Sequence, residues 1–219
     1  MEIRNGLISS DSHVVTERAA FIERMAKSKW GNRIPQVIEV EGKGQLVHRW
    51  AVNGKPLQGR GVCDCPAVMN DPLRNGYPQR WEDVPSKAYV PTERLKALDA
   101  DGFDAEVLFP NDPASFHQYE DAEFELESVR AYNDSVSEWH KSSDRFIPLA
   151  MVPLLSAMEA AVVEVERAAA NRHRGIVMFA LPSLLVERLP HISESYWYPL
   201  WDACQNLNMP IHFQASEML

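Results

Sequence analysis

Three side chains of the kinds that bind divalent metal ions lie at the ends of apolar, strand-like runs far apart in the sequence. Asp11 and His13 follow the run of residues 6–10, and His212 lies in the run 210–214. Carboxylate oxygen and neutral imidazole nitrogen are suitable metal ligands, and residues spaced i, i+2 at a strand end point the same way. Together, the three residues predict a metal site.

Each of these residues also has an explanation that needs no metal. Asp-Ser-His is a good turn, in which Asp11 caps local N–H groups and His13 is solvated. The position of His212 fits equally well a core histidine whose ring is hydrogen-bonded to the neighbouring backbone. Glu17 either orients His13 through a hydrogen bond or begins a helix. A metal site therefore requires a fold that brings the first and last strands to one rim.

The elements that must position these residues alternate between strands and helices. The strand-like runs are almost wholly apolar, which is typical of a parallel sheet that is covered on both faces. The fold class predicted is α/β. We predict strands at about 6–10, 105–109, 146–152, 175–179 and 210–214. The helices that we predict are one that Thr92 caps and that ends at Gly102, one at 121–142, one that Ser156 caps and that ends at about 171, and one at 196–207.

Five such strands fit two architectures, an open flavodoxin-like sheet or five-eighths of a closed (β/α)8 TIM barrel. Nucleotide-binding open sheets usually carry phosphate-binding glycines after the first strand. Here the first strand runs into Asp11-Ser12-His13 instead. We therefore favour an incomplete TIM barrel of about five βα strands, in which the carboxyl ends of the strands meet at one rim.

An insertion at about residues 18–91 interrupts this alternation after the first strand. Within it, the runs 35–40 and 45–52 flank Glu41-Gly42-Lys43-Gly44, which predicts a β-hairpin beside the main body. We interpret residues 1–219 as one partial barrel domain that carries this insertion as a flap.

Composition excludes several classes of partner. There are 22 Lys+Arg against 31 Asp+Glu, a formal net charge of -9, so we expect no nucleic-acid partner. No stretch approaches the roughly 20 apolar residues of a membrane span, and no signal-peptide pattern is present, so we expect a cytoplasmic protein without a membrane partner. We interpret the three cysteines, Cys63, Cys65 and Cys204, as reduced thiols, and His140, His173 and His191 as surface residues.

Motifs spread along the chain add a family resemblance. They are ISSDSHVVTE (8–17), LDADGFDAEVL (98–108), AYND (131–134), DRF (144–146), LAMVPL (149–154), YWYPLW (196–201) and MPIHF (209–213). Together they resemble the amidohydrolase-related (amidohydrolase 2) family, which includes the aminocarboxymuconate-semialdehyde decarboxylase-like enzymes. The resemblance covers nearly all of the chain except the insertion.

This resemblance implies a (β/α)8 barrel with one divalent metal ion, zinc or manganese. The family holds the ion with an acidic or histidine pair on the first strand, a histidine on the fifth and an aspartate on the eighth. Asp11, His13 and His212 stand at the matching positions. The histidine of the sixth strand and the aspartate of the eighth are expected downstream of residue 219, together with the catalytic residues. We therefore expect this chain to be the N-terminal part of a longer enzyme.

The function that the resemblance implies is a metal-dependent hydrolase or nonoxidative carboxy-lyase, active only in its full-length form. Its substrate would be a small organic molecule, carboxylated or cyclic, and the full-length form is expected to be a homo-oligomer. Loops after the strands would select that substrate, through Asn111, Asp112, His117 and Phe179. Two alternatives stay open, a noncatalytic or oligomerising barrel relative and an open-sheet domain that binds a small molecule.

Overall fold

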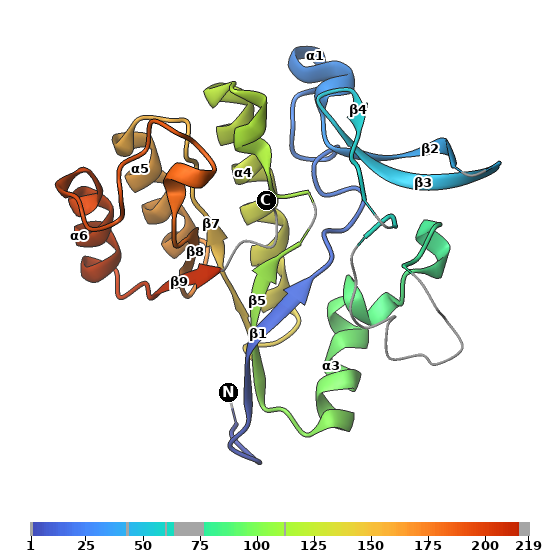
Figure 1. The fold of residues 1–219 in the computed structure, drawn as a ribbon. Coiled ribbons are helices and arrows are strands. Elements are labelled where there is room, and N and C mark those ends of the chain that lie inside the picture. The colour runs from blue at the N-terminus through green and yellow to red at the C-terminus, as the bar shows by residue number, and fades with distance from the viewer. Residues whose placement is uncertain (1, 43, 60, 64–76, 112, 215–219) are drawn as a thin grey trace. The chain divides into compact units, whose positions relative to one another are not determined.

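A computed structural model describes the chain over residues 2–42, 44–59, 61–63, 77–111 and 113–214. The chain divides into two compact units, Met1–Ala114 (unit 1) and Ser115–Leu219 (unit 2). Both are mixed α/β structures, and each contains parallel strands (Figure 1). None of the helices in the described residues combines the length and the apolar character that crossing a bilayer requires.

The described part of unit 1 contains strands, two α-helices and short 3-10 helices. In chain order they are β1 (Ile8–Val14), α1 (Lys27–Trp30), η1 (Gly31–Arg33), β2 (Gln36–Gly42), β3 (Gln45–Val52), β4 (Lys55–Pro56), η2 (Trp81–Asp83), η3 (Ser86–Ala88), α3 (Pro91–Asp101) and β5 (Ala105–Pro110).

β1 and β5 run parallel and side by side, from Ile8 opposite Ala105 to Val14 opposite Pro110 (Figure 1). β5 is an apolar strand that is buried along nearly its whole length, at the place the sequence predicts. β1 extends to Val14, whereas the sequence predicts that it ends at Ser10. Asp11 and His13 therefore lie inside the first strand, because pairing with β5 holds even its polar residues in the extended conformation.

Asp104 fixes the chain just before β1. Its carboxylate accepts hydrogen bonds from four consecutive backbone N–H groups, at 2.9, 3.0, 2.6 and 3.3 Å, those of Arg4, Asn5, Gly6 and Leu7. The bond from Arg4 contributes most to a pKa of Asp104 below its ordinary value, because backbone donors stabilise the ionised form. This carboxylate ties the start of β1 to the start of β5.

α3 connects the insertion to β5. It begins at Pro91, with Val90 as its N-cap, so the prediction that Thr92 caps this helix is wrong. Proline suits the first helical position because the N–H it lacks would have no partner inside the helix. The predicted end at Gly102 is confirmed: Gly102 has φ 75°, and the N–H of Phe103 reaches the Leu98 carbonyl at 3.0 Å.

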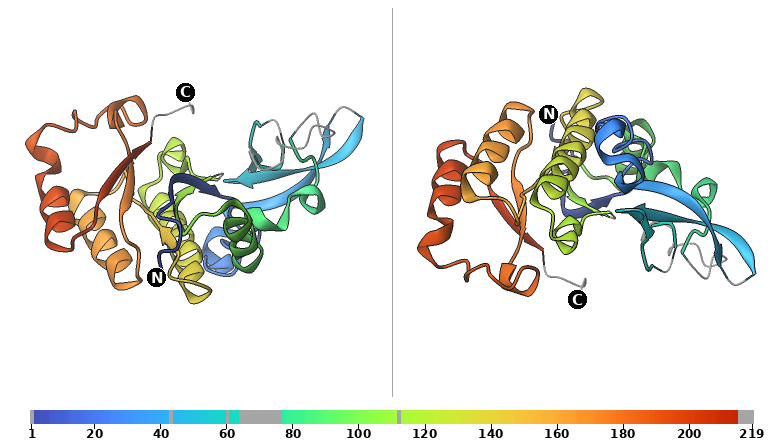
Figure 2. Two further views of the ribbon diagram at one scale, coloured as in Figure 1. Left: turned by 90° about the horizontal axis from the view of Figure 1, so that it is seen from below. Right: turned by 90° about the horizontal axis from the view of Figure 1, so that it is seen from above.

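β2 and β3 pair antiparallel from Gln36 opposite Ala51 to Gly42 opposite Gln45, over the segment where the sequence predicts a hairpin. Both views in Figure 2 show these strands as one twisted ribbon. Trp50 of β3 is buried at the base of this ribbon, edge-on to Phe21 at 5.9 Å and to Trp81 at 6.4 Å between ring centroids. Aromatic packing therefore holds the hairpin to the rest of unit 1.

Unit 2 continues the alternation of strands and helices. Its described elements are η4 (Phe116–Tyr119), α4 (Ala122–Ser137), η5 (Glu138–Lys141), β6 (Phe146–Pro148), β7 (Ala150–Met151), α5 (Met158–Ala170), β8 (Ile176–Phe179), η6 (Pro182–Leu184), η7 (Ser195–Trp197), α6 (Tyr198–Asn206) and β9 (Ile211–Gln214).

β7, β8 and β9 form a parallel sheet in that order. α5 and α6 pack against one face of it (Figures 1 and 2), where alternate strand residues such as Ala150, Ile176 and Met178 meet Val165 and Leu200 of the helices. Because side chains alternate along a strand, Met151, Val177 and His212 lie on the other face. The sheet thus presents His212 away from α5 and α6.

Two details of unit 2 differ from the sequence prediction. The strand expected at 146–152 is divided at Leu149 into β6 and β7. α5 has Ala157 as its N-cap, without a side-chain hydrogen bond, so the prediction that Ser156 caps it is wrong. The start of α4 follows the usual rule, because the Asp121 side chain accepts from the N–H of Phe124 at 3.0 Å.

Candidate metal centre

A β-bulge in β1 sets the direction of the Asp11 side chain. Ser9 pairs with Glu106 and Ser12 with Leu108, so that two residues, Ser10 and Asp11, oppose the single residue between those partners. The hydroxyl oxygens of Ser9 and Ser12 lie 2.7 Å apart across the bulge. A bulge bends its strand and redirects side chains, and bulges are frequent next to functional sites.

His13 is held in one orientation by backbone. Its Nδ1 lies 2.9 Å from the carbonyl oxygen of Pro110, and its ring packs on Phe109 with centroids 5.9 Å apart. Because a carbonyl oxygen only accepts, Nδ1 carries the proton in the neutral ring and Nε2 carries the lone pair. Metal-binding histidines are typically oriented in this way by a second hydrogen bond. Nothing in the sequence indicates Pro110 as this partner, because a backbone carbonyl leaves no mark on residue type.

The lone pair of His13 and the carboxylate of Asp11 face each other. Nε2 of His13 lies 3.6 Å from Oδ1 of Asp11, and the two side chains are 31% and 68% exposed. Two ligand atoms that each bind zinc at about 2.1 Å in tetrahedral geometry are about 3.4 Å apart. The pair therefore fits two ligands of one divalent ion in donor type, separation and access.

Glu17 makes a local contact. Its Oε2 accepts the N–H of Ala19 at 2.7 Å, in the turn that follows β1. Residues 18–24 form turns and not a helix, so the helix start that the sequence left open for Glu17 is not observed. The partner that the structure gives to Nδ1 of His13 is the carbonyl of Pro110.

His212 lies in the middle of β9 in unit 2, opposite Val177 of β8. Partial burial lowers the pKa of His212 below its ordinary value. The ring therefore stays neutral at neutral pH, and the neutral ring is the form that binds a metal. Its ring lies directly over Gly175, since a Cβ at that position would meet Cδ2 of His212 at 3.1 Å.

This close approach gives a test of how the His212 ring is seated. A methyl group on Gly175 would lie 2.9 Å from both Cδ2 of Leu149 and the Pro210 carbonyl oxygen, besides the 3.1 Å contact with His212. We expect Gly175→Ala to lower the free energy of unfolding by about 1–3 kcal/mol, because overpacking forces neighbours to shift. Urea unfolding measures this. Gly59→Ala is the control, since its Cβ would meet only the Gly61 carbonyl oxygen, at 3.6 Å; equal effects would contradict the expectation.

The residues predicted to select the substrate are found in both units. Asn111 follows β5 in unit 1 and is half-buried. In unit 2, His117 lies in η4, where burial lowers its pKa, and the half-buried Phe179 ends β8. Asp112 lies outside the described residues. Their roles toward a substrate stay predictions.

The structure places Asp11 beside His13, while His212 belongs to the other unit. Within the described residues of either unit, no three His, Cys, Asp or Glu side chains gather into a group that could hold a metal ion. The convergence of all three predicted ligands on one ion thus stays a prediction.

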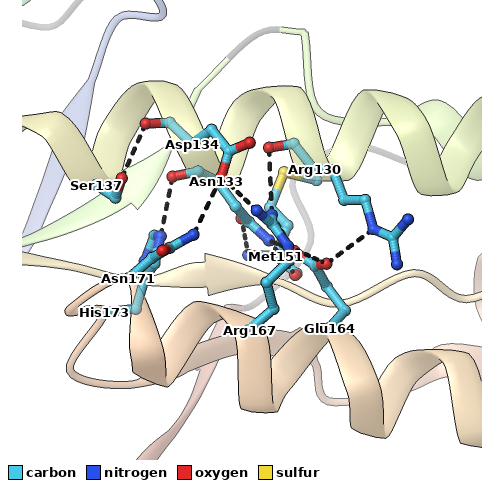
Figure 3. Close-up of polar contacts among 9 residues, drawn as sticks. All are labelled: Arg130, Asn133, Asp134, Ser137, Met151, Glu164, Arg167, Asn171 and His173. Atoms are coloured by element: carbon cyan, nitrogen blue, oxygen red, sulfur yellow. Dashed lines mark hydrogen bonds and ion pairs between the residues drawn. The ribbon is translucent and has the colours of Figure 1, made fainter. Parts of the chain in front are cut away.

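His173 is buried, so the prediction of a surface residue is wrong. It is only 4% exposed, and its Nε2 lies 2.9 Å from the carbonyl oxygen of Asn133 (Figure 3). Its Nδ1 lies 3.3 Å from the carbonyl oxygen of Pro148. Burial is the main cause of its lowered pKa. Its partners are 40 and 25 residues away in the sequence, so no local pattern indicates them.

The fold and this pair of side chains define a class: parallel α/β proteins with a histidine and a carboxylate near the carboxyl end of the first strand. Comparison with known families gives the particular family. The amidohydrolase model matches residues 47–218, and the chain belongs to the amidohydrolase family. Among curated proteins, the search finds no match.

Solved structures with the same fold include an amidohydrolase from Mycobacterium avium subsp. paratuberculosis, 17% identical over 96% of this chain and 59% of that chain, with a TM-score of 0.66. The 5-carboxyvanillate decarboxylase of Sphingomonas paucimobilis is 18% identical over 96% of this chain and 52% of its own, with a TM-score of 0.55. A dihydroxybenzoic acid decarboxylase from Polaromonas sp. JS666 contains bound manganese and an inhibitor, 2-nitroresorcinol. It is 18% identical over 99% of this chain and 51% of its own, with a TM-score of 0.55. The chain thus spans about half to three-fifths of the length of these structures.

Proposed function

We propose that this chain forms the first part of a metal-dependent hydrolase or nonoxidative carboxy-lyase. In this proposal, residues 1–219 are one partial (β/α)8 barrel, with residues 18–91 inserted after the first strand, and activity requires the full-length form. The observation that carries the proposal is the orientation of His13 by the Pro110 carbonyl, with Nε2 directed at Asp11, in a member of the amidohydrolase family.

Asp11, His13 and His212 would hold one divalent metal ion, zinc or manganese. When bound, such an ion lowers the pKa of a water molecule or polarises a substrate oxygen. The residues of the chain prepare the ligands. Pro110 holds the proton of His13 on Nδ1, and burial keeps His212 neutral. Manganese deserves the first trial, because the Polaromonas decarboxylase contains it.

The proposed substrate is a small carboxylated or cyclic molecule, with aromatic carboxylic acids as the favoured class. Support comes from similar solved structures, among them decarboxylases of 5-carboxyvanillate and of dihydroxybenzoic acid. Here the amide of Asn111 and the neutral ring of His117 would bind the carboxylate, and Phe179 would pack on the ring of the substrate. Asp112 is proposed to act beside Asn111, and the full-length enzyme to be a homo-oligomer.

Metal analysis tests this function. We expect about one manganese or zinc ion per full-length chain, and a loss of affinity of more than about 100-fold in His13→Ala, since a direct ligand should matter at least as much as its hydrogen-bond partners do. Titration of the metal-free full-length protein with manganese, followed by calorimetry, measures the affinity.

His191→Ala is the matched control, because His191 is exposed and its ring contacts only the neighbouring Ser193 among the bonds found for it. The proposal requires that this variant bind manganese like the wild type. If His13→Ala and His191→Ala bind equally well, Asp11 and His13 are not a metal pair, and the noncatalytic alternative gains support.

A further inference from the structure

We propose that Asn133 is a positioning residue for His212. Its side chain fixes β7, and a row of paired residues, Met151, Val177 and His212, carries that constraint across the sheet to β9. The inference rests on the proposed function in one respect only, namely that His212 is a metal ligand.

The Asn133 amide binds the backbone of β7 on both sides of one residue. Its Oδ1 accepts the N–H of Met151 at 2.8 Å, and its Nδ2 donates to the Met151 carbonyl at 3.1 Å. The preceding residue, Ala150, donates its N–H to Gly175 at 2.9 Å, on the side of β8. Successive residues of a strand direct their backbone N–H and C=O groups to opposite sides of the strand. At Met151, the Asn133 amide therefore forms the hydrogen bonds that a neighbouring strand would form on the side away from β8.

Glu164 of α5 fixes the orientation of this amide (Figure 3). Nδ2 of Asn133 donates to Oε1 of Glu164 at 2.7 Å, and a carboxylate can only accept, so the amide cannot flip. Glu164 is fully buried, and it is held by two bonds of 2.8 Å from Arg167 and one of 3.2 Å from Arg130. Charge-assisted bonds of this kind are strong and directional.

His173 adds a second attachment through the backbone of Asn133. The neutral ring carries one N–H, and Nε2, the nitrogen nearer to a carbonyl, donates it to Asn133 at 2.9 Å. The next residue, Arg174, donates its backbone N–H to the Pro148 carbonyl at 3.3 Å. Asn133 is therefore connected to the segment of β6 and β7 at two points, at Pro148 through His173 and Arg174 and at Met151 directly. Two points fix both the position and the direction of a short segment, where one would leave it free to pivot.

The row from Met151 to His212 connects this attachment to the proposed ligand. Met151 pairs with Val177, and Val177 pairs with His212, in parallel register. Paired residues of adjacent strands lie about 4.8 Å apart and direct their side chains to the same face. A displacement of Met151 should therefore move Val177 and His212 with it, because backbone hydrogen bonds join the three strands.

The test compares Asn133→Ala with Val165→Ala, a buried core substitution on the side of α5 and α6 in the same unit. Both variants lose stability, but only the first releases Met151. We expect Asn133→Ala to bind manganese about 10- to 100-fold more weakly than the wild type, as for other residues that orient ligands. We also expect displaced NMR signals of the Val177 and His212 amides in the metal-free protein, and neither effect in Val165→Ala.

A conservative substitution separates position from charge. Glu164→Gln removes the negative charge but keeps an oxygen that accepts the Asn133 amide, so we expect manganese affinity close to that of the wild type. Asn133→Asp keeps the acceptor for the Met151 N–H but sets an oxygen against the Met151 carbonyl and Glu164, so we expect an effect as large as that of Asn133→Ala.

The outcomes distinguish this inference from the proposed function. If the wild type binds manganese, and Asn133→Ala binds it as tightly as Val165→Ala with unmoved amide signals, the positioning role is overturned while the metal site stands. If the full-length wild type binds neither manganese nor zinc, the proposed function fails. The amide signals of Val177 and His212 then decide the positioning role alone, displacement supporting it and its absence overturning it.

Discussion

Replacing Glu164 with alanine is expected to lower the free energy of unfolding by about 3–5 kcal/mol, the usual result of breaking a buried ion pair. The carboxylate is fully buried between α4 and α5, where it accepts bonds from Arg167, Arg130 and Asn133 (Figure 3). Its removal leaves the Asn133 amide and the Arg130 guanidinium without this acceptor, and leaves Arg167 with its ion pair to Asp134. Chemical denaturation, followed by far-UV circular dichroism, measures the change.

The same helix offers the control. Glu166 is exposed, two residues along α5, so Glu166→Ala should change stability by less than about 0.5 kcal/mol. Glu164→Gln should fall between the two, since it keeps the bond from Asn133 but loses the charge. Similar losses in Glu164→Ala and Glu166→Ala would mean that the buried carboxylate does not join α4 to α5.

The buried strands and most of the helices could be predicted from the sequence, because the patterns that indicate them lie within a few neighbouring residues. β5 and β8 are short runs of mostly apolar residues, buried along nearly their whole length, and such runs favour strands of a covered parallel sheet. β9 lies where the sequence predicts it, although its residues are only partly buried. The C-terminal end of α3 at Gly102 follows from the left-handed conformation that a helix end favours.

Features that depend on long-range contacts could not be read from the sequence. The bulge at Ser10 and Asp11 exists only through pairing with β5 about 95 residues later, and the partner of His13 Nδ1 is a backbone carbonyl of that same strand. His173 resembled a surface residue because its neighbours in sequence are polar. It is buried beside the carbonyl groups of Asn133 and Pro148, which only the packed unit brings together.

The candidate site shows the same division. The types and spacing of Asp11 and His13 predict a metal pair, because the chemistry of a ligand belongs to its side chain; the structure shows the two side chains next to each other. The groups that orient these side chains are of a different kind. Pro110 and, in our proposal, Asn133 act through backbone contacts, so the residues that set the geometry of such a site are hidden from sequence inspection.

The other large effect is expected at Arg94, which holds a buried carboxylate in unit 1. Glu106 of β5 is 1% exposed, and Arg94 of α3 binds it with Nε and Nη2, each at 2.8 Å. Arg94→Ala leaves that carboxylate buried without a counter-charge, so we expect a loss of about 3–5 kcal/mol in the free energy of unfolding. Thermal and urea unfolding measure it. Lys96→Ala, at the exposed Lys96–Glu93 pair of the same helix, is the control, with an expected change below about 0.5 kcal/mol.

A double substitution shows whether the loss arises from the unpaired charge or from the missing arginine stem. Arg94→Met with Glu106→Leu removes both charges and retains most of the volume, and such replacements are often neutral or stabilising. We therefore expect the double variant to regain most of the stability that Arg94→Ala loses. If it stays as unstable as Arg94→Ala, the ion pair is not what joins α3 to β5. Recovery would instead show that stability does not require the Arg94–Glu106 ion pair as such. The loss in Arg94→Ala would then come from the carboxylate of Glu106, which is left buried in β5 without a counter-charge.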